Sequence, residues 1–430
     1  MKKLLFILFL FISLPLFGMD LYVSTTGNDS VSRASNTISA PWLTPKHAWD
    51  TAQAGDIVYF RGGTYNITAA LKVDTGSTGY NGTGSGWTAT NPITFKNYSG
   101  ETPIFRETEQ LSWMLRIAKN YNIIDGITFD INNYEVGICF GYDESPTGLT
   151  VQNCTFYGIP FHDSHTALYI GTTGGNYVTI KNNTITFEVG VSTYSAGILI
   201  YNYVTHLRIL NNAVYNGITG ISYKHSTDTD QDTEIAYNYI NGASRSGLSM
   251  NCSYGNIHDN IIITPSDALR LGETAGAVGD THNTITHNTL FSLSSHYPFN
   301  ISNDAANSNN IITNNIFTGG ASRYANGTSN TFDYNLYPSG TVVNSYTLTQ
   351  WKAAISGEVH AAQGAPTFVG GGTPTTIAGF ALTGASVGYH AASDGKDMGA
   401  DVTLVGPAGG STPTAPTSVP TIGVGGFRTW

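Results

Sequence analysis

A short unit that recurs every 20 to 29 residues constrains this chain more than any other feature of its sequence. In residues 177–185, and again in 206–214, an alternating strand pattern leads into a pair of asparagines. A second short strand pattern follows each of them, at 197–200 and at 220–223. Neither half of such a unit can bury its apolar side alone, so the copies must stack on one another. The sequence therefore predicts an all-β solenoid.

One corner position of the unit is asparagine in seven successive copies. Asparagine tolerates the left-handed backbone that a sharp corner needs, and stacked asparagine side chains can hydrogen-bond along a column. The spacing therefore predicts an asparagine ladder, with Cys154 in the same position one coil earlier. The predicted ladder consists of Asn183, Asn212, Asn238, Asn260, Asn288, Asn315 and Asn335.

The second strand of each unit also keeps its register from copy to copy. Apolar residues at alternating positions should face the interior, and the residues between and after them should face outward. The inward columns are Ile138, Leu168, Ile198, Ile221, Leu248, Leu269 and Phe299, and then Phe140, Ile170, Ile200, Tyr223, Met250, Leu271 and Ile301. The outward columns are Cys139, Tyr169, Leu199, Ser222, Ser249, Arg270 and Asn300, and then Gly141, Gly171, Tyr201, Lys224, Asn251, Gly272 and Ser302.

Composition limits the kinds of partner that this chain can have. Only 11% of its 430 residues are charged, and the formal net charge of −10 argues against a nucleic-acid partner. Three cysteines without close spacing predict neither a disulfide framework nor a metal motif. The abundance of glycine and of other turn-forming residues agrees with a β-rich fold that has many corners.

The two ends of the chain carry signals of their own. Residues 1–18 have the pattern of a secretory signal peptide, because Lys2 and Lys3 precede an apolar stretch that ends in small and turn-forming residues. This pattern predicts a secreted protein with no membrane span in the mature chain. Residues 19–404 then form the β-helix domain, and the Gly/Pro/Ser/Thr-rich residues 405–430 form a linker and tail.

The start of the predicted domain has an end cap and a family resemblance. Thr44-Pro45 is the pattern of a capped helix start, and a short helix there would cover the first coil. The opening includes Leu-Tyr-Val-Ser-Thr-Thr-Gly-Asn-Asp (21–29), Pro-Trp-Leu-Thr-Pro (41–45) and Ala-Gly-Asp-Ile-Val-Tyr-Phe-Arg-Gly-Gly-Thr-Tyr (54–65). It resembles secreted right-handed parallel β-helix proteins of the pectate-lyase-like group, which includes lyase-like and mannuronan epimerase-like enzymes. The resemblance implies a right-handed parallel β-helix that acts on a polysaccharide.

Two outward cations on the second strand are the leading candidates for catalysis. Lys224 and Arg270 share one predicted sheet face, and the strand spacing places their α-carbons about 12 Å apart. β-Elimination of a uronic-acid polymer needs a base and a positive group that stabilises the developing enolate. Like-charge repulsion from an arginine favours the neutral form of a lysine base. With His225 as the candidate proton donor, these residues predict a lyase that acts on an anionic polysaccharide.

Polar residues around this pair supply candidates for substrate and metal binding. Tyr169, Tyr201 and Asn251 face outward on the same strands, and Glu273 follows the strand of Arg270, so we expect all four to bind substrate. Acids also alternate through the segment after Lys224 and offer the hard oxygen ligands that calcium prefers. Calcium is the cofactor that lyases of the resembled group often use. The predicted calcium ligands are Asp228, Asp230 and Asp232.

The match to one branch of the resembled group is partial. Ile-Ser-Tyr-Lys-His (221–225) is similar to the lysine-bearing coil of the chondroitin and alginate lyase-like branch. That branch places acidic calcium ligands just before its lysine, where residues 216–222 contain no acid. It also has an arginine in the following coil, where this chain has Ser249 and Met250. The mechanism therefore does not carry over residue by residue.

Three alternatives to a lyase stay open, and we expect a monomer in each case. The first is a non-catalytic carbohydrate-binding or adhesin-type β-helix, because a fold of this kind does not fix a function. The second is an epimerase, since Asp163-Ser164-His165 is similar to an Asp-x-His motif of mannuronan epimerases. The third is a two-carboxylate glycoside hydrolase that uses acids at strand ends. Those acids are Asp143, Glu144, Asp267 and Glu273.

Overall fold

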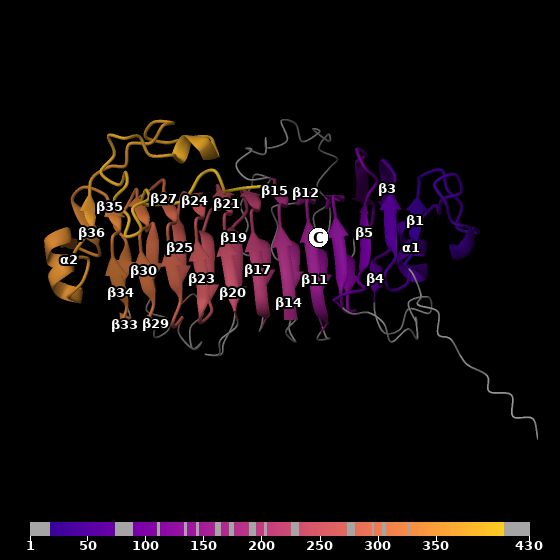
Figure 1. Cartoon of the computed structure of the whole chain (residues 1–430), viewed down its shortest axis with the longest axis horizontal. Helices are drawn as coiled ribbons and strands as arrows, with labels where there is room; N and C mark the ends of the chain where they lie inside the picture. The colour runs from indigo at the N-terminus through magenta and orange to yellow at the C-terminus, as the bar shows by residue number, and fades with distance from the viewer. Residues whose placement is uncertain are drawn as a thin grey trace, which may run out of the picture.

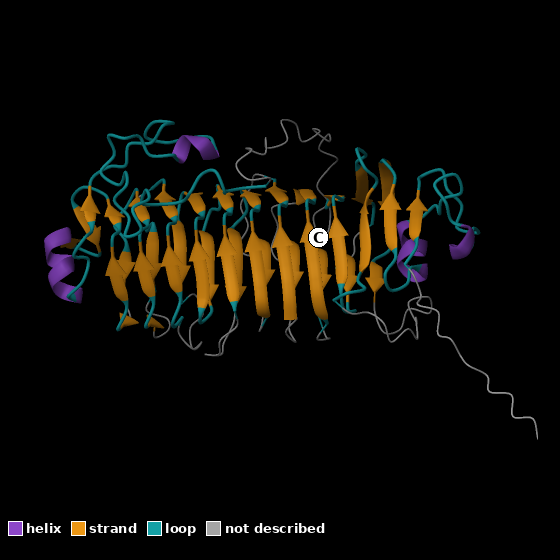
Figure 2. Ribbon diagram, in the orientation of Figure 1, coloured by secondary structure: helices purple, strands orange, loops and turns teal. Residues whose placement is uncertain are grey.

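The computed structural model is a parallel β-helix in which each coil contributes three strands (Figures 1 and 2). It describes residues 18–73, 89–109, 112–132, 136–142, 146–159, 165–171, 176–188, 195–201, 204–224, 232–272, 280–294, 296–302, 307–325 and 327–407. The sequence pattern predicted two strands per coil and missed a short third one, such as Thr184–Phe187. That strand directly follows the asparagine corner, and its few residues give too short an alternation to recognise.

The strands stack into three long parallel sheets, which we number in the order in which the chain visits them. Sheet 1 consists of β1 (Asp20–Val23), β2 (Ile57–Phe60), β5 (Ile93–Asn97), β8 (Asn122–Asp125), β11 (Thr147–Gln152), β14 (Asn176–Lys181), β17 (Thr205–Leu210), β20 (Thr233–Ala236), β23 (Gly255–His258), β26 (Thr284–Thr286), β30 (Ile311–Thr313) and β34 (Thr331–Asp333). Sheet 2 consists of β3 (Gly63–Ile67), β6 (Pro103–Glu107), β9 (Thr128–Asp130), β12 (Thr155–Ile159), β15 (Thr184–Phe187), β18 (Ala213–Tyr215), β21 (Tyr239–Asn241), β24 (Ile261–Thr264), β27 (Thr289–Ser292), β31 (Ile316–Thr318), β35 (Leu336–Tyr337) and β38 (Ala362–Gln363). Sheet 3 consists of β4 (Leu71–Val73), β7 (Trp113–Ile117), β10 (Val136–Phe140), β13 (Thr166–Ile170), β16 (Ala196–Ile200), β19 (Thr219–Lys224), β22 (Ser246–Asn251), β25 (Asp267–Leu271), β28 (Phe299–Ile301) and β32 (Arg323–Tyr324).

The predicted inward columns form the core between the three sheets. In sheet 3, Ile198 pairs with Leu168 on one side and with Ile221 on the other, as the spacing predicted. All three side chains are fully buried. Because every coil places apolar residues in the same columns, the core is one continuous cluster that runs along the helix axis.

The predicted asparagine ladder is present at the corner between sheets 1 and 2. In each rung, the side-chain amide of one asparagine donates to the side-chain oxygen of the next, as Asn260 does to Asn288 at 2.9 Å. Cys154 begins the column, since its backbone N–H donates to Asn183. The last rung, Asn335, donates instead to the buried carboxyl of Glu358. The ladder therefore ends in an acid that the sequence pattern did not reveal.

Short helices cover both ends of the core (Figure 1). Helix α1 (Pro45–Thr51) begins at the predicted Thr44 cap, whose hydroxyl accepts from the backbone N–H of His47. Helix α2 (Leu348–Ile355) places Trp351 against Phe332 near the other end. The remaining described elements are the 3₁₀ helices η1 (Arg33–Ser35) and η2 (Ile377–Phe380), the parallel pair β29 (Asn307–Ser308) and β33 (Gly327–Thr328), and the antiparallel pair β36 (Thr341–Val343) and β37 (Tyr346–Thr347). No helix among the described residues is long and apolar enough to cross a lipid bilayer.

The chain after β38 turns back along the outside of sheet 2 (Figure 1, yellow). Phe380, Leu382 and Met398 of this segment pack against Ile261 and Ile316, which face outward from sheet 2. Its far end reaches Tyr237, whose carbonyl accepts the N–H of Gly406. We call residues 365–406 the C-terminal strap. Residues 408–430, most of the predicted linker and tail, lie outside the described part of the chain.

Candidate functional site

A groove with a volume of about 510 Å³ runs along the outer face of sheet 3. Strands β7, β10, β13, β16 and β19 form its floor, so it spans five successive coils. Its described lining ranges from Trp113 at one end to Lys224 and Arg245 at the other. A groove along the outside of a solenoid suits an extended ligand such as a polymer.

Four aromatic rings form a continuous row in one half of this groove. The ring centroids are 5.5 Å apart from Trp113 to Tyr142, 6.3 Å from Tyr142 to Tyr169, and 6.2 Å from Tyr169 to Tyr201. Tyr142 and Tyr201 remain 42% and 45% exposed. Burial, and then the neighbouring Cys139 and tyrosines, raise the pKa of Tyr169 to about 12, so its hydroxyl keeps its proton at neutral pH. We call these four residues the aromatic row.

The other half of the groove carries its two charged side chains. Lys224 is the last residue of β19 and is partly buried; the structure gives it no ion pair with another described residue. Arg245 lies one residue before β22, in the next coil. Among the described lining residues, Lys224 and Arg245 are the only Lys or Arg, and none is Asp or Glu. This end of the groove is therefore suited to a negatively charged group.

Buried polar atoms along β16, β19 and β22 lack hydrogen-bond partners within the described part of the chain. They include the hydroxyls of Ser195 and Ser222, which line the groove, and both amide atoms of Asn251. Asn251 pairs in register with Lys224 and is 2% exposed. A buried polar atom without a partner costs about 1–3 kcal/mol, so such atoms are expected where a polar ligand binds.

Five of the ten predicted site residues lie on this face of the molecule. Lys224, Tyr169 and Tyr201 line one groove. Arg270 lies on the same sheet, since it pairs with Ser249, but it is not part of the groove lining. His225 and Glu273 fall outside the described residues, so their roles stay predictions.

Several residues of the predicted outward columns are buried. Cys139 and Ser249 have no exposed surface, and Asn300 is only 2% exposed. Alternation correctly assigns them to the outer face of sheet 3. Small side chains on that face lie below longer neighbours, as Cys139 does between Arg116 and Tyr169. The sequence pattern gives the direction of a side chain and not the depth at which it lies.

The predicted calcium ligands are not assembled among the described residues. Asp228 and Asp230 lie outside them, and Asp232 accepts hydrogen bonds from His206 and Arg208 of β17 in sheet 1. These contacts, through His206 first and then Arg208, lower the pKa of Asp232. The described part of the chain holds no group of three His, Cys, Asp or Glu side chains that could bind a metal. Calcium therefore stays a prediction, and no catalytic step is derived through it.

The acids of the alternative mechanisms do not form a pair in the groove. Asp267, at the start of β25, is buried and accepts a hydrogen bond from the Asn300 amide at 2.6 Å. Asp143, Glu144 and Asp163 lie outside the described residues, whereas His165 is buried before β13. The described residues thus offer no carboxylate pair for hydrolysis in this groove.

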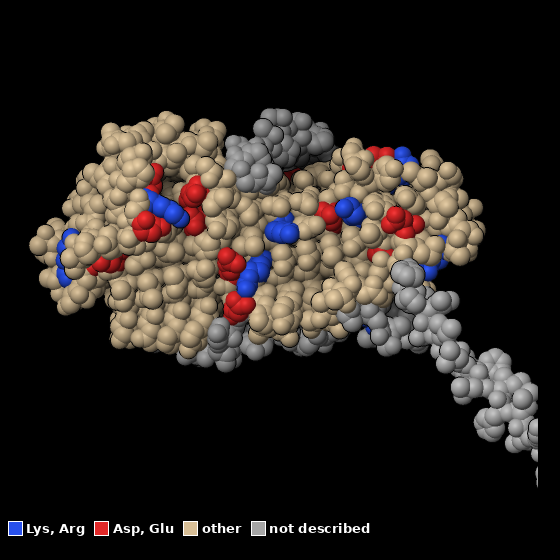
Figure 3. Space-filling model, in the orientation of Figure 1, with Lys and Arg blue, Asp and Glu red and all other residues tan. Residues whose placement is uncertain are grey.

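Several charged side chains on sheet 1 are paired with one another. Lys96 contacts Asp125, and Arg208 contacts both Asp232 and Glu234. Figure 3 accordingly shows red and blue groups side by side on this face, although a few groups of either colour stand alone. Such pairs stabilise a surface modestly and leave no single-sign patch for an anionic polymer.

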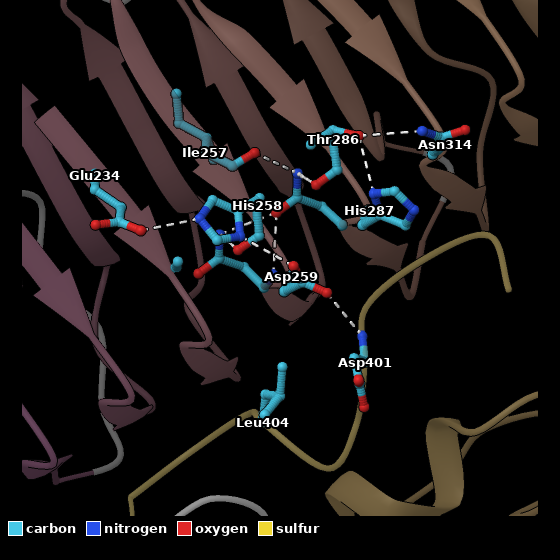
Figure 4. Close-up of polar contacts among 12 residues, drawn as sticks. Glu234, Ile257, His258, Asp259, Thr286, His287, Asn314, Asp401 and Leu404 are labelled. Atoms are coloured by element: carbon cyan, nitrogen blue, oxygen red, sulfur yellow. Dashed lines mark hydrogen bonds and ion pairs between the residues drawn. The ribbon is translucent and has the colours of Figure 1, made fainter. Parts of the chain in front are cut away.

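A histidine network joins this face to the C-terminal strap (Figure 4). His258 contacts Glu234 at 3.1 Å and Asp259 at 2.9 Å, and the other oxygen of Asp259 accepts the backbone N–H of Asp401 in the strap. Burial lowers the pKa of His258, but its hydrogen bonds to Asp259 and Glu234 outweigh this and raise it above the usual value. The network attaches the strap and shares no residue with the groove.

Sequence reasoning missed the groove's Trp113, Tyr142 and Arg245, which are aromatic or basic. Trp113 and Tyr142 lie at the edges of β7 and β10, outside the repeat that was used to align the coils. Arg245 precedes the regular alternation of β22. A search for aromatic and basic residues within two positions of each sheet 3 strand would have found all three.

Comparison with known proteins agrees with this architecture. A family model for the Pel9A-like right-handed β-helix region matches residues 21–186. Pectate lyase PEL9 of Emericella nidulans is 39% identical over 85 residues, and this match covers 20% of the chain and 18% of that relative. The chain thus matches less than a fifth of the length of this curated relative.

The similarity to a solved structure extends over nearly the whole chain. The crystal structure of pectate lyase Pel9A covers 89% of this chain and 96% of its own, with a TM-score of 0.54 and 15% identity. At this identity the similarity concerns the fold alone. This protein therefore has the right-handed parallel β-helix fold, and its residues 21–186 are similar to the Pel9A-like β-helix family model.

Proposed function

We propose that this protein is a polysaccharide lyase that binds an anionic, uronic-acid-containing polysaccharide in the groove on sheet 3. The observation that carries the proposal is the position of Lys224, at the charged end of a five-coil groove and beside buried polar atoms without partners. The lyase names of its relatives agree with this reading. A secreted location, predicted from residues 1–18, is part of the same proposal.

The proposed reaction is β-elimination with Lys224 as the base. The neutral amine takes the proton at C5 of a uronate, the C–H electrons form the C4–C5 double bond, and the C4–O bond breaks. A cation beside the uronate carboxylate stabilises the negative charge that develops on it. By register Arg270 is the nearer candidate, because it pairs with Ser249, which pairs with Ser222, two residues from Lys224. Arg245 lies at the other end of β19, where its backbone N–H donates to Ile218, and offers a second cation in the groove lining. The departing oxygen takes its proton from solvent or from His225.

Binding without catalysis is the second candidate function. The aromatic row favours it, because exposed tyrosine and tryptophan rings bind sugars in proteins that have no catalytic base. Ultraviolet absorbance distinguishes the two candidate functions. Elimination creates an unsaturated sugar that absorbs ultraviolet light, whereas binding alone creates no such product.

Ultraviolet absorbance during incubation with uronic-acid polysaccharides tests the proposal. We expect an increase with the wild-type protein, with and without added calcium as parallel conditions, and its loss in Lys224→Ala. Lys181→Ala is the matched control, because Lys181 lies on sheet 1, away from the groove. Polymer binding without absorbance or chain shortening would instead establish a binding protein. Equal activity in Lys224→Ala would refute the assignment of the base.

A further inference from the structure

The two halves of the groove differ in chemistry. Trp113, Tyr142, Tyr169 and Tyr201 occupy the coils of β7, β10, β13 and β16, and the described lining of those coils contains no charged residue. Lys224 and Arg245 belong to the following coils. A polymer that lies along the groove therefore meets aromatic rings at one end and positive charge at the other.

The sequence supplies few cations to the aromatic half. From Trp113 to Tyr201 the chain contains only three Lys or Arg residues. Arg116 lies over the rings of Trp113 and Tyr142, at 5.2 and 5.8 Å from their centroids. Lys119 follows β7, and Lys181 belongs to sheet 1. A carboxylate on every sugar would thus meet only one nearby guanidinium, since the described lining of this half contains no charged side chain.

We infer that the preferred substrate carries a uronate at Lys224 and uncharged sugars, either neutral or esterified, over the aromatic row. This inference rests on the proposed function and specifies its substrate. It excludes an unsubstituted polyuronate as the best ligand, because such a chain would place several carboxylates against rings that cannot compensate their charge. Transfer of an unpaired charge out of water is costly.

The geometry of the row fits successive sugars of one chain. Neighbouring rings belong to neighbouring coils, and a pyranose unit is about as long as the ~4.8 Å spacing between adjacent strands. Each sugar of a chain parallel to the axis then lies over one ring, and its C–H face removes apolar ring surface from water. A methyl ester or an absent carboxylate improves this contact, whereas a carboxylate weakens it.

Binding to matched polymers tests the inference. The full-length Lys224→Ala variant, which does not consume its ligand, is titrated by calorimetry with polygalacturonate and with the same polymer after partial methyl esterification. We expect tighter binding of the esterified polymer. In Tyr169→Ala we expect binding of the esterified polymer to weaken about tenfold, with little change for the unesterified one. Tyr177→Ala is the matched control, since Tyr177 lies near the start of β14 in sheet 1 and is exposed there.

The possible outcomes separate this inference from the proposed function. Tighter binding of the unesterified polymer, or an equal loss for both polymers in Tyr169→Ala, would overturn the inference even where the wild-type protein is an active lyase. Selective loss with the esterified polymer would support it even where no absorbance develops. Circular dichroism of Tyr169→Ala confirms that the β-helix is intact, and Tyr169→Phe, which keeps the ring, should retain binding.

Discussion

The acid at the end of the asparagine ladder makes the stability of the β-helix depend on pH. Glu358 has no exposed surface, and one of its carboxyl oxygens accepts hydrogen bonds from Asn335 and from the hydroxyl of Tyr337. The other oxygen has no partner among the described residues. Burial raises the pKa of Glu358 from 4.5 to about 7. We therefore predict that Glu358→Gln removes a pH-dependent loss of stability.

The size of the effect follows from this shift. Because the folded-state pKa lies above the unfolded one, the favourable contribution of the neutral acid is complete below pH 4.5 and is lost as the pH rises through about 7. A shift of about 2.5 units at ~1.4 kcal/mol each corresponds to about 3 kcal/mol. The uncharged glutamine does not titrate. Any constant cost of its buried amide is the same at every pH and cancels in the comparison.

Urea unfolding of the wild-type protein and Glu358→Gln across this pH range, followed by circular dichroism, measures the effect. The stability of the variant relative to the wild type should increase by about 3 kcal/mol from acid to slightly alkaline pH. Glu101→Gln is the control with the opposite sign, since hydrogen bonds from Arg61 and the Gly62 N–H lower the pKa of Glu101. Parallel pH curves for the wild type and Glu358→Gln would refute the argument.

Two further predictions concern the ladder and the strap. Asn260→Ala should lower the free energy of unfolding by about 3–5 kcal/mol, because it removes the side-chain acceptor of the buried Asn238 backbone N–H and a donor to the carbonyls of Ile235 and His258; the exposed Asn256→Ala should have almost no effect in the same urea titration. Phe380 of the strap is only 2% exposed, so Phe380→Ala removes buried packing between the strap and sheet 2. This change should make residues 365–406 sensitive to limited proteolysis while sheet 3 stays protected. Cleavage that begins in sheet 3 instead would contradict a separate strap.

Much of the fold was predictable because it is repetitive. The apolar column of Ile138, Leu168 and Ile198 and the asparagine ladder each repeat one kind of residue in successive coils. Every further copy therefore strengthens the evidence for the same register. Glu358 and the strap occur once. Nothing in the local pattern of Phe380 or Met398 indicates that they pack on the outside of sheet 2, more than a hundred residues away from Ile261.

The candidate site was predictable only in part, for a related reason. Alternation places Lys224, Arg270 and Tyr169 on one face, and the structure agrees. Arg245 and Tyr142 lie at strand edges, where alternation does not apply. Whether these two residues line the groove depends on the path of the chain between strands, and that path differs from coil to coil because the connections differ in length.

Local periodicity is enough to predict the solenoid, its register and the ladder, because repeated units stack on one another, and the helix cap at Thr44 is equally local. Contacts between coils determine which outward residues form a groove, how deeply Cys139 and Asn251 are buried, and where the strap covers sheet 2. These features depend on side chains from different coils and on distant segments that meet in space. No short-range pattern in the sequence encodes such contacts.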